Sequence, residues 1–339
     1  MDLRTVPRAA RRAGRSLSRR ARTEADRFAS RHDWADLALF HELEPPPAGG
    51  GHQFLRALLR ELRDRGVDVE LNRISGVTSA CLFNSFNFDV SRLRRFARAD
   101  CRMVHRVDGP IGAYRGFDDG TDRRIAEVNR KLADATILQS RFSLEKHLEL
   151  GYELRAPVVI PNAVDPAIFH PPEVREPLDG RKIRVIASSW SVNPRKGADT
   201  FAWLDRHLDR DRYELTYLGQ APAQFGWIRA VGPLGSDAVA AELRRSDLYV
   251  AASRDDPCSN ALLEALACGL PTAYLDCGGH PELVGKGGLP FRTDDELPDV
   301  LDLLVAGLDG FRAGIATPSI TSVADRYLEV LGLARVAPA

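Results

Sequence analysis

Short apolar runs alternate with amphipathic segments along the chain from residue 36 onwards. Apolar runs bounded by turn residues are typical of buried strands, and apolar positions that recur every three or four residues are typical of helices. The pattern predicts strands at 36–41, 67–71, 80–83, 102–107, 135–138 and 157–160, with helices near 52–65, 90–98, 120–132 and 141–149. Strands and helices that alternate in this way build a mainly parallel sheet.

A second series of the same kind follows a proline-rich stretch at 161–181, where prolines break any regular element. Its predicted strands start at 183 and lie further at 213–218, 227–231, 247–252 and 271–275, with helices near 198–208, 236–245, 260–268 and 295–308. A last amphipathic segment at 320–331 can pack on either domain. We therefore expect an α/β chain with two Rossmann-like, doubly wound parallel-sheet domains.

These patterns divide the chain into five parts. We expect a basic amphipathic extension (1–31), a first domain (32–160), a linker (161–181), a second domain (182–318) and a C-terminal helix and tail (319–339). A length of 339 residues suits two domains that each bury a core. With 44% hydrophobic and 28% charged residues, the composition excludes a mostly disordered or collagen-like chain.

The five cysteines are odd in number and form no CxxC pair, which argues against a disulfide framework and against a zinc site. No apolar stretch approaches the roughly 18 to 20 residues of a membrane span, and no signal core is visible. We therefore expect a cytoplasmic protein without a bound metal.

The zero formal charge conceals an asymmetry, because the first 22 residues hold eight arginines against one acid, Asp2. Two interpretations of this segment stay open: docking on an anionic membrane surface, for example at the inner membrane face, and a frayed extension without a partner. Lysine is scarce along the chain, and a genome-wide coding bias would give the same skew, so the abundance of arginine does not indicate nucleic-acid binding.

Four loops that follow predicted strands carry residues suited to phosphate or sugar, because ligands of open parallel sheets bind at the carboxyl ends of strands. The first contains three consecutive glycines, which either let backbone N–H groups approach a phosphate or make a plain flexible turn. The second ends in Arg195 and Lys196 just before a helix, a pair of cations that suits a diphosphate unless both are solvated loop charges.

The third loop holds Asp256 and leads into a helix that Ser259 or Asn260 caps, with Glu264 in its second turn. Both acids can face one pocket, where a carboxylate accepts hydrogen bonds from vicinal hydroxyls of ribose or sugar. Helix-dipole partnership is the alternative for Asp256, whereas Glu264 lies too far along the helix for it. The fourth loop contains a glycine pair that ends at Gly279 and permits close backbone approach.

Four motifs in this order resemble the retaining glycosyltransferases of family 4: VIPNAVDPAIF (159–169), NPRKGAD (193–199), DPCSNALLEALACGLPT (256–272) and GGHPELV (278–284). The resemblance covers about residues 35–331 and is strongest in the C-terminal half. It implies two Rossmann-like domains in the GT-B arrangement and a metal-independent hexosyltransferase. It also implies a UDP-, GDP- or ADP-sugar as donor substrate, with no cofactor.

Carried over residue by residue, the resemblance assigns the ribose hydroxyls to Glu264, the transferred sugar to Asp256 and the diphosphate to Lys196. The remaining donor contacts that it implies are backbone amides of Cys258, Ser259 and Asn260, backbone near Gly232 and Pro233 for the base, Gly279, and the glycine loop at Gly50 and Gly51.

Three positions depart from the family pattern. Asp256 is one methylene shorter than the usual Glu, and Ser191 stands where the family has an arginine, which weakens the donor site unless Arg195 or another residue substitutes. Asp108 stands where the family often places a histidine that contacts the donor sugar. His105 is a nearby alternative, but its parity along the strand turns it to the other face of the sheet.

We expect transfer of a sugar, with retention, from a nucleotide-diphosphate donor to a hydroxyl of a glycan or of a lipid-linked acceptor, as in polysaccharide biosynthesis. Two alternatives stay open. A sugar-nucleotide 2-epimerase has the same GT-B architecture, and a non-catalytic nucleotide-sugar-binding subunit fits the three departures from the family pattern.

Overall fold

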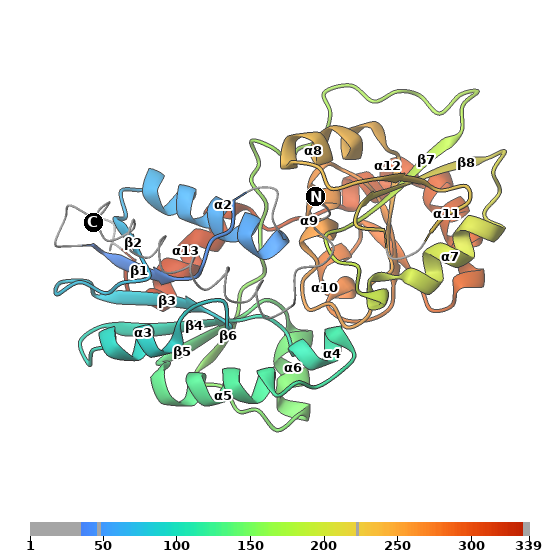
Figure 1. Cartoon of the computed structure of the whole chain (residues 1–339). Coiled ribbons are helices and arrows are strands. Elements are labelled where there is room, and N and C mark those ends of the chain that lie inside the picture. Colours follow the sequence, from blue (N-terminus) through green and yellow to red (C-terminus); the bar gives the residue numbers. More distant parts are fainter. Residues whose placement is uncertain (1–34, 46–48, 222–223, 335–339) are drawn as a thin grey trace, which may run out of the picture.

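The two predicted series of strands form two separate parallel sheets. The computed structural model describes residues 35–45, 49–221 and 224–334, so the expected extension at 1–31 lies outside the described residues. Within these ranges each sheet has six strands. Figure 1 shows the two sheets with helices packed against them, which is the two-domain Rossmann-like α/β architecture expected from the sequence.

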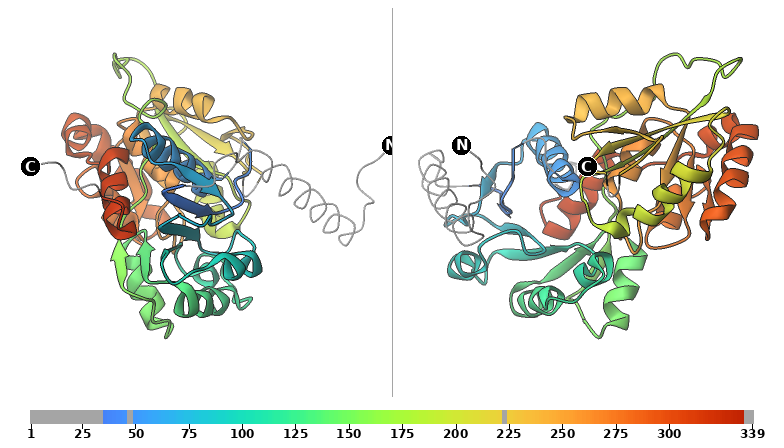
Figure 2. Two further views of the ribbon diagram at one scale, coloured as in Figure 1. Left: turned by 90° about the vertical axis from the view of Figure 1, so that its left-hand side faces the viewer. Right: turned by 45° about the vertical axis from the view of Figure 1, so that its right-hand side comes forward.

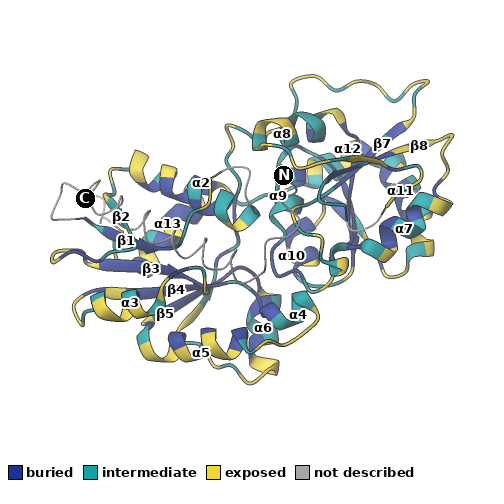
Figure 3. Ribbon diagram, in the orientation of Figure 1, coloured by how far each residue is buried: buried dark blue, intermediate teal, exposed yellow. Residues whose placement is uncertain are grey.

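The first sheet has the strand order β2-β1-β3-β4-β5-β6. Its strands are β1 (Leu37–Phe40), β2 (Val69–Leu71), β3 (Ala80–Asn84), β4 (Arg102–Val107), β5 (Ala135–Leu138) and β6 (Pro157–Val159). Its helices are α2 (Gly50–Asp64), α3 (Val90–Phe96), α4 (Ile111–Arg115), α5 (Thr121–Leu132) and α6 (Arg141–Glu149). β1 and β3 are buried throughout, as Figure 3 shows in dark blue, which explains their unbroken apolar sequence.

The second sheet has the order β12-β11-β10-β7-β8-β9. Its strands are β7 (Ile183–Ser189), β8 (Tyr213–Gly219), β9 (Arg229–Val231), β10 (Leu248–Ala251), β11 (Thr272–Leu275) and β12 (Gly288–Phe291). Its helices are α7 (Ala198–His207), α8 (Ser236–Arg245), α9 (Asn260–Ala267), α10 (His280–Val284), α11 (Leu297–Ala306) and α12 (Leu308–Gly314), with a 3-10 turn η2 (Pro194–Lys196) before α7.

The C-terminal helix α13 (Ile320–Leu331) packs on the first domain, although it follows the second along the chain. Its Tyr327 ring lies 6.0 Å from the Phe54 ring of α2, centroid to centroid. The red helix lies beside the blue α2 in Figures 1 and 2. The sequence left the partner of this helix open, and the structure shows that the chain crosses twice between the domains.

Some short elements were missed or misjudged in the sequence. The predicted helix at 295–308 is broken at Gly307, where α11 ends and α12 starts. β12 was not predicted, because its glycine and proline disfavour a strand interior; β12 lies at the sheet edge, where Pro290 is tolerated. The five-residue helices α4 and α10 are too short to show a helical period.

Candidate functional site

A cavity of about 370 Å³ lies between the two domains. The second domain lines it with the loops after β7 and β10 and with the start of α9. The first domain lines it with the amino end of α2, the loop after β4 and part of α4. Because the carboxyl ends of parallel strands face the cavity from both sides, it lies where ligands of such sheets bind.

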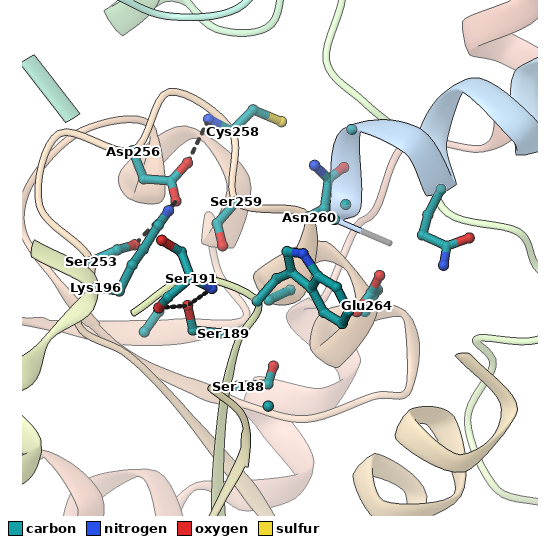
Figure 4. A pocket seen from close by; sticks show the side chains of 18 of the residues that line it. Ser188, Ser189, Ser191, Lys196, Ser253, Asp256, Cys258, Ser259, Asn260 and Glu264 are labelled. Atoms are coloured by element: carbon teal, nitrogen blue, oxygen red, sulfur yellow. Dashed lines mark hydrogen bonds and ion pairs between the residues drawn. The ribbon is translucent and has the colours of Figure 1, made fainter. Parts of the chain in front are cut away.

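Lys196 and Asp256 meet in this cavity as an ion pair, with Nζ 2.6 Å from Oδ2 (Figure 4). Asp256 is buried and also accepts hydrogen bonds from the Ser253 hydroxyl at 3.3 Å and the Cys258 N–H at 3.2 Å. Burial alone raises the pKa of Asp256, but Lys196 and His280 beside it outweigh that effect and hold the pKa below its usual value. Asp256 is therefore ionised, and its hydrogen bonds hold it in one position.

The turn that presents Lys196 depends on a glycine. Gly197 has a φ of 95°, and a Cβ there would lie 2.7 Å from Cβ of Ala252. A side chain at this position would therefore clash as well as strain the backbone. From this turn, the Lys196 ammonium lies 5.5 Å from the ring centroid of Tyr114 in α4, a cation–π distance. The lysine is thus held between both domains.

Glu264 lies in the second turn of α9 and also lines the cavity. Ser259 caps this helix and accepts a hydrogen bond from the Leu262 N–H, which selects one of the two caps that the sequence allowed. Among the described residues, the Glu264 carboxyl has no hydrogen-bond or ion-pair partner, and burial raises its pKa to about 8. A half-buried acid without a partner among the described residues is suited to receive a polar ligand.

The opposite wall carries a second ion pair, between Arg106 of β4 and Asp108 just after it. Nη1 of Arg106 lies 2.7 Å from Oδ1 of Asp108 and 2.6 Å from Oδ1 of Asn84. Gln139 also donates a hydrogen bond to Oδ1 of Asp108. Both residues of the pair line the cavity, so the first domain contributes a carboxylate to it.

His105, the alternative to Asp108, lies on the other face of the sheet, as its parity predicts. Its ring stacks on Phe83 with centroids 4.3 Å apart, and its Nδ1 lies 3.2 Å from Nδ2 of Asn129. Burial lowers the pKa of His105 to about 3, so it is a neutral core residue.

Ten of the predicted site residues line the cavity: Gly50, Gly51, Asp108, Lys196, Pro233, Asp256, Cys258, Ser259, Asn260 and Glu264. Gly50 and Gly51 differ in one respect from the prediction, because they are the first residues of α2 and not part of the loop before it. The Cys258 N–H differs too, since it donates to Asp256 and is not left for a ligand.

Arg195, Gly232 and Gly279 do not line the cavity. Arg195 pairs with Asp255, and its Cδ would lie 2.8 Å from a Cβ on Gly116, so the arginine packs against the loop after α4. Gly279 supports the site from behind: its N–H donates to the Asp256 carbonyl at 2.8 Å, and a Cβ there would lie 2.3 Å from the Pro257 carbonyl. Arg195 therefore does not take the place of the family's missing arginine in the cavity, contrary to the sequence-based expectation.

Several cavity residues were missed in the sequence, above all Arg106. A charge inside the apolar strand at 102–107, at the parity opposite to His105, is the signal that could have identified it. Trp190 and Phe86 also line the cavity although each is more than one-third exposed. No sequence pattern distinguishes these aromatic residues from those of the core.

Within the described ranges, no group of three or more His, Cys, Asp or Glu side chains is arranged to hold a metal ion. A search of the same residues for a helix long and apolar enough to cross a membrane finds none.

A family model described as "Glycosyl transferases group 1" matches residues 186–306, which include most of the second domain. No curated protein matches the chain in sequence. Solved structures match over most of the chain at low identity, so that they show its fold.

Three of these structures match the chain over more than four-fifths of its length. Sucrose-phosphate synthase from Thermosynechococcus elongatus has 15% identity and a TM-score of 0.63, over 87% of this chain and 94% of that one. Anabaena HepE, solved in complex with UDP-glucose, has 16% identity and a TM-score of 0.58, over 88% and 96%. AviGT4, involved in avilamycin A biosynthesis, has 18% identity and a TM-score of 0.55, over 88% and 97%.

The family match in the second domain and the two facing Rossmann-like sheets agree with each other. Residues 186–306 thus resemble the group 1 glycosyl transferases, and the chain has the two-domain Rossmann-like fold called GT-B.

Proposed function

We propose that the protein transfers a sugar, with retention at the anomeric carbon, from a nucleotide-diphosphate donor to a hydroxyl of a glycan or lipid-linked acceptor. The observation that supports it best is the grouping of Lys196, Asp256 and Glu264 around the amino end of α9 in one cavity. HepE, which shares the fold, was solved in complex with UDP-glucose, so a UDP-sugar is the first donor to test.

The donor is held mainly by the second domain. Glu264 forms hydrogen bonds with the ribose hydroxyls, because both oxygens of its carboxyl lack a partner among the described residues. Lys196 and the N–H groups at the start of α9 bind the diphosphate. Asp256 accepts a hydrogen bond from a hydroxyl of the transferred sugar, and its ion pair with Lys196 orients the lysine.

The transfer itself is a front-face reaction. The bond between the anomeric carbon and the phosphate oxygen breaks, and a bond to the acceptor oxygen forms on the same face. The acceptor proton passes to the leaving diphosphate, so that no protein nucleophile is required. Lys196 and the helix amides stabilise the negative charge that grows on the diphosphate. We propose that the reaction therefore needs no bound metal.

Screening UDP-, GDP- and ADP-sugars by thermal shift identifies the donor, because a ligand that binds only the folded chain raises its melting temperature. The product formed with an acceptor extract is then analysed by NMR for the configuration of the new bond. We expect the donor's configuration to be kept, and unchanged activity in EDTA. An inverted product contradicts the mechanism, and conversion of the donor to its epimer without acceptor indicates a 2-epimerase instead.

We also propose that the basic segment 1–31 holds this enzyme at an anionic inner membrane face, because each arginine contributes about 1 kcal/mol there. Deletion of residues 1–31 should lower sedimentation with anionic liposomes and leave donor hydrolysis unchanged. Equal sedimentation of the shortened chain would show that the segment has no such role.

A further inference from the structure

Three polar side chains form a continuous line from the first domain to the second. Arg106 is 1% exposed, and its Nη2 donates to Oδ1 of Asn162 at 2.9 Å. Nδ2 of Asn162, which is fully buried just after β6, donates to Oδ1 of Asn260 at 3.0 Å. Asn260 is the first residue of α9 and lines the cavity. The line therefore runs from a buried charge to the wall of the site.

The charge at one end fixes the direction of every hydrogen bond along this line. Arginine has donors only, so the atom of Asn162 that faces Arg106 has to be the carbonyl oxygen. The NH₂ group of Asn162 then faces Asn260, which has to offer its own oxygen in return. As a result, the NH₂ group of Asn260 is turned away from Asn162.

This NH₂ group lies where two helices meet. A Cβ built on Gly50, the first residue of α2, would lie 2.8 Å from Nδ2 of Asn260. Figure 4 shows Asn260 beside the blue ribbon of α2. Neither α2 nor α9 has an acidic residue in its first turn, so N–H donors and positive helix ends gather here. An anion matches such a group of donors.

We propose that the side-chain amide of Asn260 is a hydrogen-bond donor to the phosphates of the substrate, and that Arg106 and Asn162 are positioning residues that hold it in this orientation. The inference rests on the proposed function, which supplies the nucleotide diphosphate. It assigns a role to Arg106 that does not require the arginine to touch the substrate.

The substitution Asn162→Asp tests this directly. A carboxylate still accepts from Arg106, so the buried charge keeps its partner, but it has no N–H for Asn260. The Asn260 amide then has to turn and donate to position 162, which directs its oxygen toward the phosphates. We expect the Kd for UDP, measured by calorimetry on the full chain, to rise roughly tenfold to a hundredfold.

A double-variant comparison separates orientation from a general loss of structure. Asn260→Ala should weaken UDP binding in the same range, and adding Asn162→Asp to it should cause no further loss, because both act through one amide. The matched control is Asn129→Asp, at another fully buried asparagine, whose side-chain partners in the described part of the chain all belong to the first domain. It should leave the Kd unchanged.

Binding of UDP by Asn162→Asp within twofold of the unaltered chain overturns the inference and leaves the proposed function standing. Inorganic pyrophosphate is the second probe. If the unaltered chain binds pyrophosphate but no nucleotide, the proposed function fails, and loss of pyrophosphate binding in Asn162→Asp still supports the role of Asn260. A chain that binds neither UDP nor pyrophosphate contradicts both.

Discussion

The two walls of the cavity carry the same kind of ion pair in opposite orientations. In the second domain the cation is the more exposed member, with Lys196 at 21% and Asp256 at 8%. In the first domain the carboxylate is the more exposed one, with Asp108 at 32% and Arg106 at 1%. One wall therefore presents positive charge to a ligand, and the facing wall presents negative charge.

This difference indicates a division of labour in the proposed reaction. The wall with the exposed cation suits the diphosphate of the donor, whose charge grows during the reaction. The wall with the exposed carboxylate suits a neutral hydroxyl, which donates a hydrogen bond to it. Among the described residues, both hydrogen bonds to the Asp108 side chain use Oδ1, so Oδ2 is left for such a hydroxyl. The opposed pairs would thus hold donor and acceptor on different sides.

Removal of the exposed cation should have the largest effect. Lys196→Ala should lower kcat for sugar transfer by roughly 10²-fold to 10³-fold, as for other donors that stabilise a growing negative charge. The neighbouring cation is the control: Arg195 pairs with Asp255 outside the cavity, so Arg195→Ala should change kcat only slightly. Steady-state rates with a saturating donor measure both, and equal losses in the two variants would remove the distinction between the two cations.

Removal of the exposed carboxylate should have a smaller and different effect. Asp108→Asn keeps an oxygen for Arg106 but loses the charge, so we expect KM for the acceptor to rise roughly tenfold, as for a lost hydrogen bond to a charged group. The Kd for the donor should stay unchanged. The control Asp255→Asn alters a pair that does not line the cavity. A loss of donor affinity in Asp108→Asn would show that both walls serve the donor.

The smallest effect concerns stability and depends on pH. The pKa of Glu264 rises from its usual 4.5 to about 8 in the folded chain, so between these values the folded state holds a proton that the unfolded chain releases. Stability therefore falls as pH rises through this window. Glu264→Gln removes the titration, so its melting temperature should exceed that of the unaltered chain by at least about 2 °C at pH 8 and by little at pH 5.

The exposed Glu145 provides the matched control for this measurement, because Glu145→Gln changes the same chemical group away from the cavity. It should leave the melting temperature unaltered at both pH values. Equal stability of Glu264→Gln and the unaltered chain at pH 8 would contradict the raised pKa.

The positions of Lys196, Asp256 and Glu264 could be predicted from the sequence, because each lies a few residues from a recognisable strand end or helix start. A strand, a helix cap at Ser259 and a helical turn are enough to place Glu264 in the cavity. The fold was accessible for the same reason, since buried parallel strands are continuous apolar runs.

The contacts across the domains could not be predicted in this way. Arg106, Asn162 and Asn260 are far apart in the sequence, and only the packing of both sheets brings them together. The orientation of Arg195 is a second feature that could not be predicted. The sequence places two adjacent cations before one helix and does not indicate which of them faces the cavity. In the structure, Arg195 lies against Gly116, and Lys196 lines the cavity.

The close approach of α2 and α9 has a consequence for how the two domains bind an anion. Two helix amino ends, each equivalent to roughly half a positive charge, face each other across the gap where Gly50 meets Asn260. These two positive ends repel each other, and an anion such as a diphosphate between them would relieve the repulsion. In the proposed reaction, the diphosphate of the donor would therefore be bound by both domains at once.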